Sequence, residues 1–231
     1  MISDSQITAL NKYLSVTNGR EKLCRLVQYF ARFYAFYLLQ KGASQKTIQQ
    51  WTDLKTHLAT GRKLFRLLKP LELAQSSIKS LSLEDPVLRM LHFIKFASNF
   101  FYFNLEALSL VDTVNFLKLR NIKRINRLGL KCWLISLIAS ILSGLYQLRK
   151  LSVRVDDRKT LDDKGDSKLE QKKMKKQIDA VRYQLCQDFF DICIPVGSLK
   201  WLKLNEAAIG IAGVVSSAMA MNTQWKKANS S

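Results

Sequence analysis

Two long uncharged segments in the second half of the chain constrain its fold most. Residues 132–148 carry no charge over 17 positions, and residues 207–225 carry none over 19 positions. A helix needs about 20 mostly apolar residues to cross a bilayer, with a lower limit of about 17. Only three prolines and nine glycines occur in 231 residues, so few positions interrupt a helix. The sequence therefore predicts an all-α membrane protein with one or two C-terminal membrane-spanning helices.

Small residues recur every fourth position within both uncharged segments. They are Ser136, Ser140 and Gly144 in the first segment, and Ala208, Ala212, Ser216 and Ala220, with Gly213 beside them, in the second. Small side chains at this spacing let helices approach closely, so we expect both stripes to pack against other helices. The second segment is the better spanning candidate, because Trp225 and then Lys226 and Lys227 follow as an aromatic and basic anchor. A buried helix of a soluble core is the alternative for the first segment.

The charge of the chain predicts an anionic partner. It carries 37 lysines and arginines against 18 acids, a net charge of +19. Nucleic acid and anionic lipid are the two polyanionic candidates. The aromatic residues fall within apolar helical patterns and not at base-stacking positions, so we expect an anionic phospholipid membrane and no nucleic acid. Part of this charge is concentrated in a basic patch just before the first uncharged segment: Lys118, Arg120, Lys123, Arg124 and Arg127.

The region around residues 60–83 has the pattern of an amphipathic membrane-remodelling helix. One arc is apolar and is expected to insert into the membrane: Leu64, Phe65, Leu67, Leu68 and Leu71. The opposite arc is basic and is expected to hold lipid headgroups: Arg62, Lys63, Arg66 and Lys69. Each base adds about 1 kcal/mol near an anionic surface. Pro70 should bend or end the helix. A solvated face on a packed helix is the alternative, because periodicity does not separate the two.

The rest of the N-terminal half also reads as helical. Residues 5–39 predict two helices, the second capped by Thr17 or Asn18. Residues 44–60 predict a third helix. Residues 86–117 are apolar and aromatic with a few charges, which predicts a buried or interfacial helix and makes a membrane span a poor fit.

The C-terminal half adds a charged stretch between its two apolar segments. Residues 149–176 are rich in bases and acids and poor in apolar residues, so we expect a solvated or partly disordered loop. Residues 175–194 regain helical periodicity, and Pro195 should break that helix. The chain then divides into an N-terminal helical region (1–117), a basic patch and first hydrophobic segment (118–148), the charged loop (149–176), and a C-terminal helix with the second hydrophobic segment (177–231).

No motif of an enzyme or of a cofactor site occurs. The chain has no phosphate-binding loop, no nucleophile elbow and no dinucleotide fingerprint, so we expect no catalytic activity and no cofactor. Two histidines and four cysteines without a Cys-x-x-Cys pair argue against a metal site. The cysteines also lack the spacing of a disulfide framework, and a reducing compartment is expected. They are Cys24, Cys132, Cys186 and Cys193.

Three sequence blocks carry a family resemblance. They are Asn18-Gly19-Arg20-Glu21-Lys22 with Arg25, Gln28-Tyr29 and Arg32-Phe33, then Gly61-Arg62-Lys63-Leu64-Phe65-Arg66, and finally Gly210-Ile211-Ala212-Gly213-Val214-Val215-Ser216-Ser217. In this order and spacing, over nearly the whole chain, they resemble the peroxisomal membrane protein 11 (peroxin-11) family.

The resemblance implies a protein of the peroxisomal membrane that elongates this membrane before fission and so promotes peroxisome proliferation. An amphipathic helix, matching the region from residue 61 onward, would enter the cytosolic leaflet. The resemblance further implies a homo-oligomer, cytosolic termini, and a dynamin-related GTPase with its membrane adaptor as partners.

Two other functions stay open at the level of sequence. The first is a pore for small metabolites, which needs polar residues lining a bundle, such as Asn104, Glu106 and Lys131. The second is a soluble helical scaffold whose apolar segments form its core.

Overall fold

The computed structural model describes residues 3–160 and 167–230, and all regular structure within them is helical. The helices are α1 (Asp4–Ser15), α2 (Thr17–Gln40), α3 (Gln45–Phe65), α4 (Lys69–Ser80), α5 (Pro86–Thr113), α6 (Ile122–Thr160), α7 (Ser167–Ser198) and α8 (Glu206–Asn229). The predicted all-α fold is confirmed for this part of the chain.

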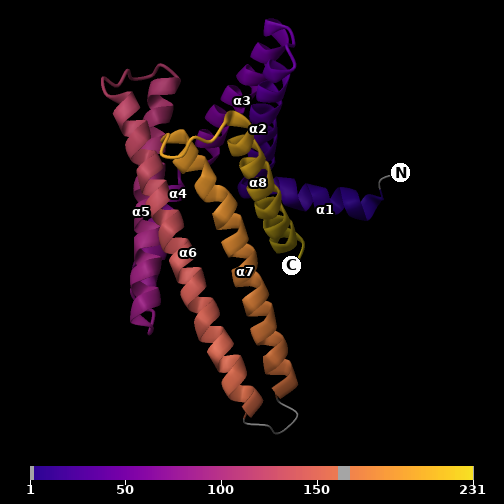
Figure 1. Ribbon diagram of the computed structural model, residues 1–231, viewed down its shortest axis with the longest axis vertical. Helices are drawn as coiled ribbons and strands as arrows, with labels where there is room; N and C mark the ends of the chain where they lie inside the picture. Colours follow the sequence, from indigo (N-terminus) through magenta and orange to yellow (C-terminus); the bar gives the residue numbers. More distant parts are fainter. Residues whose placement is uncertain (1–2, 161–166, 231) are drawn as a thin grey trace.

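The helices form two groups that meet along α7 (Figure 1). In one group α4 packs on α5, α5 on α6, and α6 on α7. In the other group α2 lies between α3 and α8. Contacts of α7 with α8, and of α3 with α5, join the groups. Figure 1 also shows α6 and α7 extending side by side beyond the other helices, and α1 projecting outward to the N-terminus.

Four of the helices begin where a polar side chain caps the first turn. These caps are Ser3 before α1, Ser44 before α3, Asp85 before α5 and Asn205 before α8. The expected cap of α2 by Thr17 or Asn18 is wrong, because Val16 holds the capping position and no side chain bonds there. Val16 alone separates α1 from α2, so Thr17 and Asn18 already lie inside the helix.

The expected charged loop at 149–176 is wrong for the described residues. Helix α6 continues to Thr160 and α7 begins at Ser167, which leaves only residues 161–166 of that stretch outside the description. An established helix adds residues at little cost, and lysine, arginine, glutamine and glutamate are good helix formers. The polar composition therefore indicates a solvated helix surface as readily as a loop.

The expected break at Pro195 is also wrong, because α7 runs through this residue and ends at Ser198. Proline removes one backbone donor and normally kinks a helix interior. Here it lies in the last turn, where its side chain is fully buried and its carbonyl accepts a hydrogen bond from the Leu199 amide at 2.8 Å. Tight packing near the helix end offsets the single lost hydrogen bond.

Among the described residues, one helical segment, Ile122–Arg154 in α6, is long and apolar enough to cross a membrane. The structure thus reverses the expected order of the two candidates. Helix α8 does not meet the same criterion of length and composition; Ser216 and Ser217 lie within it and Asn222 lies near its end. It is also covered by protein, since α2 and α7 both pack against it.

Candidate functional site

The molecule places charged side chains inside and large apolar side chains outside. Glu21, Arg25, Arg62, Asp188 and Asp191 are each less than 8% exposed. The buried apolar cluster is small and consists of Tyr29, Ile194 and Ile209 with three partly buried neighbours. Water-soluble proteins rarely bury so many charged side chains or expose so much apolar surface. This distribution indicates that much of the outer surface faces lipid.

A group of exposed apolar side chains lies where α3 ends and α4 begins. The five residues predicted to insert into a membrane, Leu64, Phe65, Leu67, Leu68 and Leu71, are between 40% and 74% exposed. Ile78 and Leu81 extend this surface along α4 and were missed by the sequence analysis, although Ile78 follows Leu71 by seven residues, a helical repeat. Together these seven residues form the α3–α4 apolar surface.

The helix expected across residues 61–71 is interrupted near Pro70, as expected, but the break falls at residues 66–68, before the proline. Helix α3 ends at Phe65 and α4 begins at Lys69, with a tight turn between them. The amide of Leu67 bonds the carbonyl of Leu64 at 3.3 Å in that turn. Pro70 explains the break, because proline fits the first turn of a helix but has no N–H to bond the carbonyl of Arg66 four residues earlier, and its ring clashes with that carbonyl.

Arg62 points into the protein. Its Nε and Nη2 donate to one oxygen of Glu21 on α2 at 2.9 and 2.7 Å, and its Nη1 donates to Gln28 at 2.5 Å. Burial alone would raise the pKa of Glu21, but the charges of Lys22, Arg62 and Arg66 outweigh this and hold the pKa well below its ordinary value. The headgroup contact expected for Arg62 is therefore replaced by an internal ion pair.

The other three bases of the expected headgroup face also have protein partners. Arg66 donates to Glu106 on α5 at 2.8 Å, and Lys63 donates to the Ser109 hydroxyl at 2.9 Å. Lys69 binds Glu72 one turn away at 2.7 Å. The bases do lie opposite the apolar residues, as the periodicity predicts. For Arg62, Lys63 and Arg66, however, the basic side faces the protein interior and the apolar side faces outward.

Two further polar contacts tie distant helices together. Arg25 on α2 forms a buried ion pair with Asp191 on α7, and the same guanidinium nitrogen donates to Ser216 on α8 at 3.2 Å. Lys95 on α5 donates to Ser140 on α6 at 2.9 Å, and Ser140 donates to Asp188 on α7 at 2.5 Å. Ion pairs and hydroxyls thus form the contacts at the centre of the molecule.

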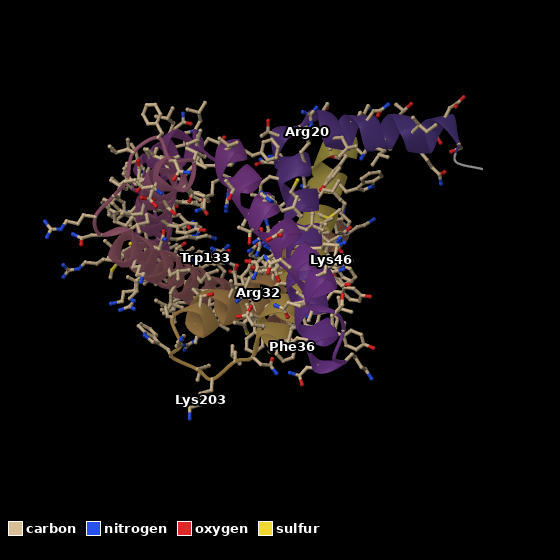
Figure 2. The ribbon with its side chains drawn as sticks, turned by 90° about the horizontal axis from the view of Figure 1, so that it is seen from above. Arg20, Arg32, Phe36, Lys46, Trp133 and Lys203 are labelled. Carbon is tan, nitrogen blue, oxygen red and sulfur yellow. The ribbon has the colours of Figure 1, made fainter. Side chains whose placement is uncertain are left out.

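These polar groups surround a cavity of about 570 Å³ between the two groups of helices. Figure 2 labels two lining residues, Arg32 and Trp133, and both lie toward the middle of the molecule, whereas Lys46 and Lys203 lie at its periphery. Glu106 lines the cavity, as the pore alternative expects. Asn104 and Lys131 do not line it and are exposed.

Both stripes of small residues lie against helices of the same chain. Gly213 on α8 faces the ring of Tyr29, and Gly210 faces the backbone of Phe33, both on α2. Gly144 on α6 faces Leu185 on α7. The remaining members, Ser136, Ser140, Ala212, Ser216 and Ala220, are buried, and Ala208 is half-buried. Close packing within one chain occupies the surfaces that sequence analysis assigned to helix contacts.

The bases of the expected basic patch are exposed where α5 turns into α6. They are Lys118, Arg120, Lys123, Arg124 and Arg127. Val114, Phe116 and Leu117 are exposed beside them, Phe116 at 87%. No sequence pattern predicted the exposure of these three apolar residues. An apolar tip flanked by bases, at the start of the spanning candidate, suits the boundary between headgroups and hydrocarbon.

The fold and these surfaces define an all-α membrane protein that surrounds a charged interior with apolar helix faces. Comparison with known proteins gives the particular family. The family model described as peroxisomal biogenesis factor 11 matches residues 7–225, so the chain belongs to this family. It is a protein of the peroxisomal membrane, as the names of its relatives state.

Three of the relatives match along nearly their whole lengths. Peroxisomal biogenesis factor 11 of Schizosaccharomyces pombe is 25% identical over 97% of both chains. Peroxisomal membrane protein PMP30B of Candida boidinii is 28% identical over 95% of this chain and 94% of its own. Human peroxisomal membrane protein 11A is 24% identical over 93% and 95%. No solved structure gives a significant match.

Proposed function

We propose that this protein elongates the peroxisomal membrane by inserting its α3–α4 apolar surface into the cytosolic leaflet, and so promotes peroxisome fission and proliferation. One observation carries the proposal: α4 exposes Leu71 and Ile78 and buries Pro70, Ser77 and Ser80. An element with its apolar side outward is suited to lipid. Shallow insertion enlarges one leaflet relative to the other and favours curvature.

In this mechanism, the bases that bind lipid headgroups lie outside the α3–α4 region. Arg62 and Arg66 are bound to Glu21 and Glu106, so they hold α3 against its neighbours. The exposed bases between Lys118 and Arg127 take the headgroup role, each contributing about 1 kcal/mol near an anionic surface. Self-association concentrates the inserted surfaces, and the narrowed membrane is the substrate for a dynamin-related GTPase recruited through its membrane adaptor.

Reconstitution of the full chain into liposomes with anionic lipid, followed by electron microscopy, tests this function. The wild type should produce tubules. Leu68→Glu with Leu71→Glu should abolish them, because two carboxylates oppose insertion. Gln45→Glu with Gln50→Glu adds the same charge at exposed polar positions in the first two turns of α3, away from the α3–α4 apolar surface, and should leave tubules intact. Equal tubulation by both double variants would contradict insertion of this surface.

The polar cavity favours a second function, a pore for small metabolites. Charged and amide groups line about 570 Å³ between helices, which is the arrangement a hydrophilic pathway needs. Conductance of the purified chain in planar bilayers tests it. A pore predicts single-channel steps that change when Glu106→Gln alters the lining charge.

A further inference from the structure

The central cavity is lined by more bases than acids. Its acids are Glu21, Glu106, Asp188 and Asp191. Its bases are Lys22, Arg25, Arg32, Arg62, Lys63, Arg66, Lys69 and Lys95. Eight bases against four acids leave a surplus of four. Arg32 and Lys69 are balanced by Glu206 and Glu72, which lie outside the lining, so the surplus within the cavity is two.

The surplus is greatest around Glu21. This one carboxylate has three bases within 4 Å: Arg62 at 2.7 Å, Lys22 at 3.0 Å and Arg66 at 3.8 Å. Arg66 also forms an ion pair with Glu106. Lys63 directly follows Arg62 in the sequence. In the described part of the chain it forms no ion pair with a carboxylate and donates only to the Ser109 hydroxyl. Positive charge on this side of the cavity thus exceeds its counter-charge.

The bases differ in how far they are removed from water: the Lys22 side chain is 30% exposed and Lys63 is half-buried. Burial lowers the pKa of Lys63. Burial also lowers the pKa of Lys22, and the positive charges of Arg25 and Arg62 lower it further against the opposing effect of Glu21. The Arg25 side chain is only 8% exposed, and its Nε has no hydrogen-bond partner among the described residues. Ammonium groups and a guanidinium N–H in this state gain most from a bound anion.

We propose that the cavity binds a phosphate group on its Glu21 side, with Lys22 and Lys63 as the charge partners. Lysine ammonium groups and guanidinium forks are the usual protein partners of phosphate. The volume of about 570 Å³ is that of a small-molecule site and exceeds what a bare phosphate fills. The stacked rings of Tyr102 and Trp133, with centroids 5.5 Å apart, add an apolar wall for the remainder of the ligand.

A phosphate can reach such a cavity from two sources, a phospholipid headgroup or a soluble phosphorylated metabolite. Isothermal titration calorimetry of the full chain in a neutral detergent separates them. The titrants are short-chain phosphatidic acid, glycerol 3-phosphate and a nucleoside triphosphate, with short-chain phosphatidylcholine as a zwitterionic reference. Binding of phosphatidic acid alone identifies the lipid source. Binding of the soluble phosphates identifies the metabolite source.

Substitutions then locate the site. Lys22→Gln with Lys63→Gln should weaken binding of the preferred ligand at least tenfold. Lys46→Gln with Lys203→Gln removes the same charge at the periphery (Figure 2) and should change the dissociation constant less than twofold. Absence of binding by every phosphate titrant, or equal weakening by both pairs, would overturn the proposal.

A third variant tests the site without removing a base. Asn18 lines the cavity four residues before Lys22 on α2, so Asn18→Asp places a carboxylate one helical turn from this ammonium. The new carboxylate should raise the melting temperature of the unliganded protein and weaken phosphate binding at least fivefold. Unchanged binding would contradict the site. A chain that tubulates liposomes but binds no phosphate would overturn this proposal and leave the proposed function standing.

Discussion

Arg62 of α3 and Glu21 of α2 form a buried ion pair that joins these two helices. Two nitrogens of the guanidinium donate to one carboxylate oxygen at 2.7 and 2.9 Å, and both side chains are at least 93% buried. The pair fixes how α3 rotates about its own axis. With Arg62 inward, Leu64 lies on the outer side, so a charged contact inside sets which apolar residues of α3 face outward.

Removing the acid of this pair should be costly. Glu21→Gln leaves Arg62 buried without a counter-charge, and breaking one partner of a buried pair costs about 3–5 kcal/mol. We expect the free energy of unfolding in mild detergent, measured by circular dichroism against denaturant, to fall by about this amount. Glu72→Gln is the control, because Glu72 pairs with Lys69 at the surface, where such pairs are worth about 1 kcal/mol or less. Equal losses would show that Glu21 has no special role.

The same pair makes stability depend on pH with a defined sign. The pKa of Glu21 is held below its ordinary value by Lys22, Arg62 and Arg66 against the effect of burial. Its contribution is therefore fully present above the unfolded pKa of about 4.3 and is lost as pH falls toward the lower folded pKa. The difference in unfolding free energy between wild type and Glu21→Gln should shrink from pH 6 to pH 3. A difference independent of pH would exclude an ionised Glu21.

In the α3–α4 region, sequence periodicity predicts which residues share a face but not which face points inward. The separation of Leu64 and Leu68 from Arg62 and Arg66 onto opposite sides follows from a repeat of 3.6 residues. Which side faces inward depends on acids that lie 41 residues before Arg62 and 40 residues after Arg66. No local pattern contains that information. For a lipid-facing protein, the usual assumption that the apolar side is buried is inverted.

The charged stretch at residues 149–176 illustrates a second limit of sequence interpretation. Residues such as Lys172 and Lys173 are compatible with a loop and with a solvated helix, and composition does not distinguish them. The continuation of α6 and α7 depends on the apolar parts of both helices, which pack against each other and propagate helix outward. Helix existence was predictable from Ile178 and Leu185, whereas the helix ends were not.

Close packing of α8 on α2 should make Gly210 intolerant of a side chain. A Cβ at this position would lie 2.9 Å from the backbone N and Cα of Phe33, atoms that cannot move without shifting α2. Gly210→Ala should cost about 1–3 kcal/mol, as overpacking does. Gly61→Ala in α3 meets nothing within 4 Å and should instead stabilise by roughly 0.5–1 kcal/mol through helix propensity. Denaturant unfolding in detergent measures the change in unfolding free energy of each variant. Destabilisation by both substitutions would refute the packing argument.

The outward face of α6 should hold the protein in the membrane. Ile138 and Leu142 lie one turn apart on this face and are 44% and 49% exposed. An arginine at the centre of a spanning helix costs about 2.5–3.5 kcal/mol on insertion scales, so Ile138→Arg with Leu142→Arg opposes insertion by roughly 5–7 kcal/mol. After carbonate extraction of membranes, the wild type should stay in the pellet and the double variant should move to the supernatant.

Gln171→Arg with Gln177→Arg is the matched control for that extraction. It adds the same two charges on α7, at exposed positions of its polar N-terminal part. These positions lie away from the face of α6 that is expected to meet hydrocarbon, so the control chain should remain in the pellet with the wild type. Release of the wild type by carbonate would instead mean that α6 packs against protein and does not span the bilayer. Release of the control would mean that added charge alone, and not its place on α6, detaches the chain.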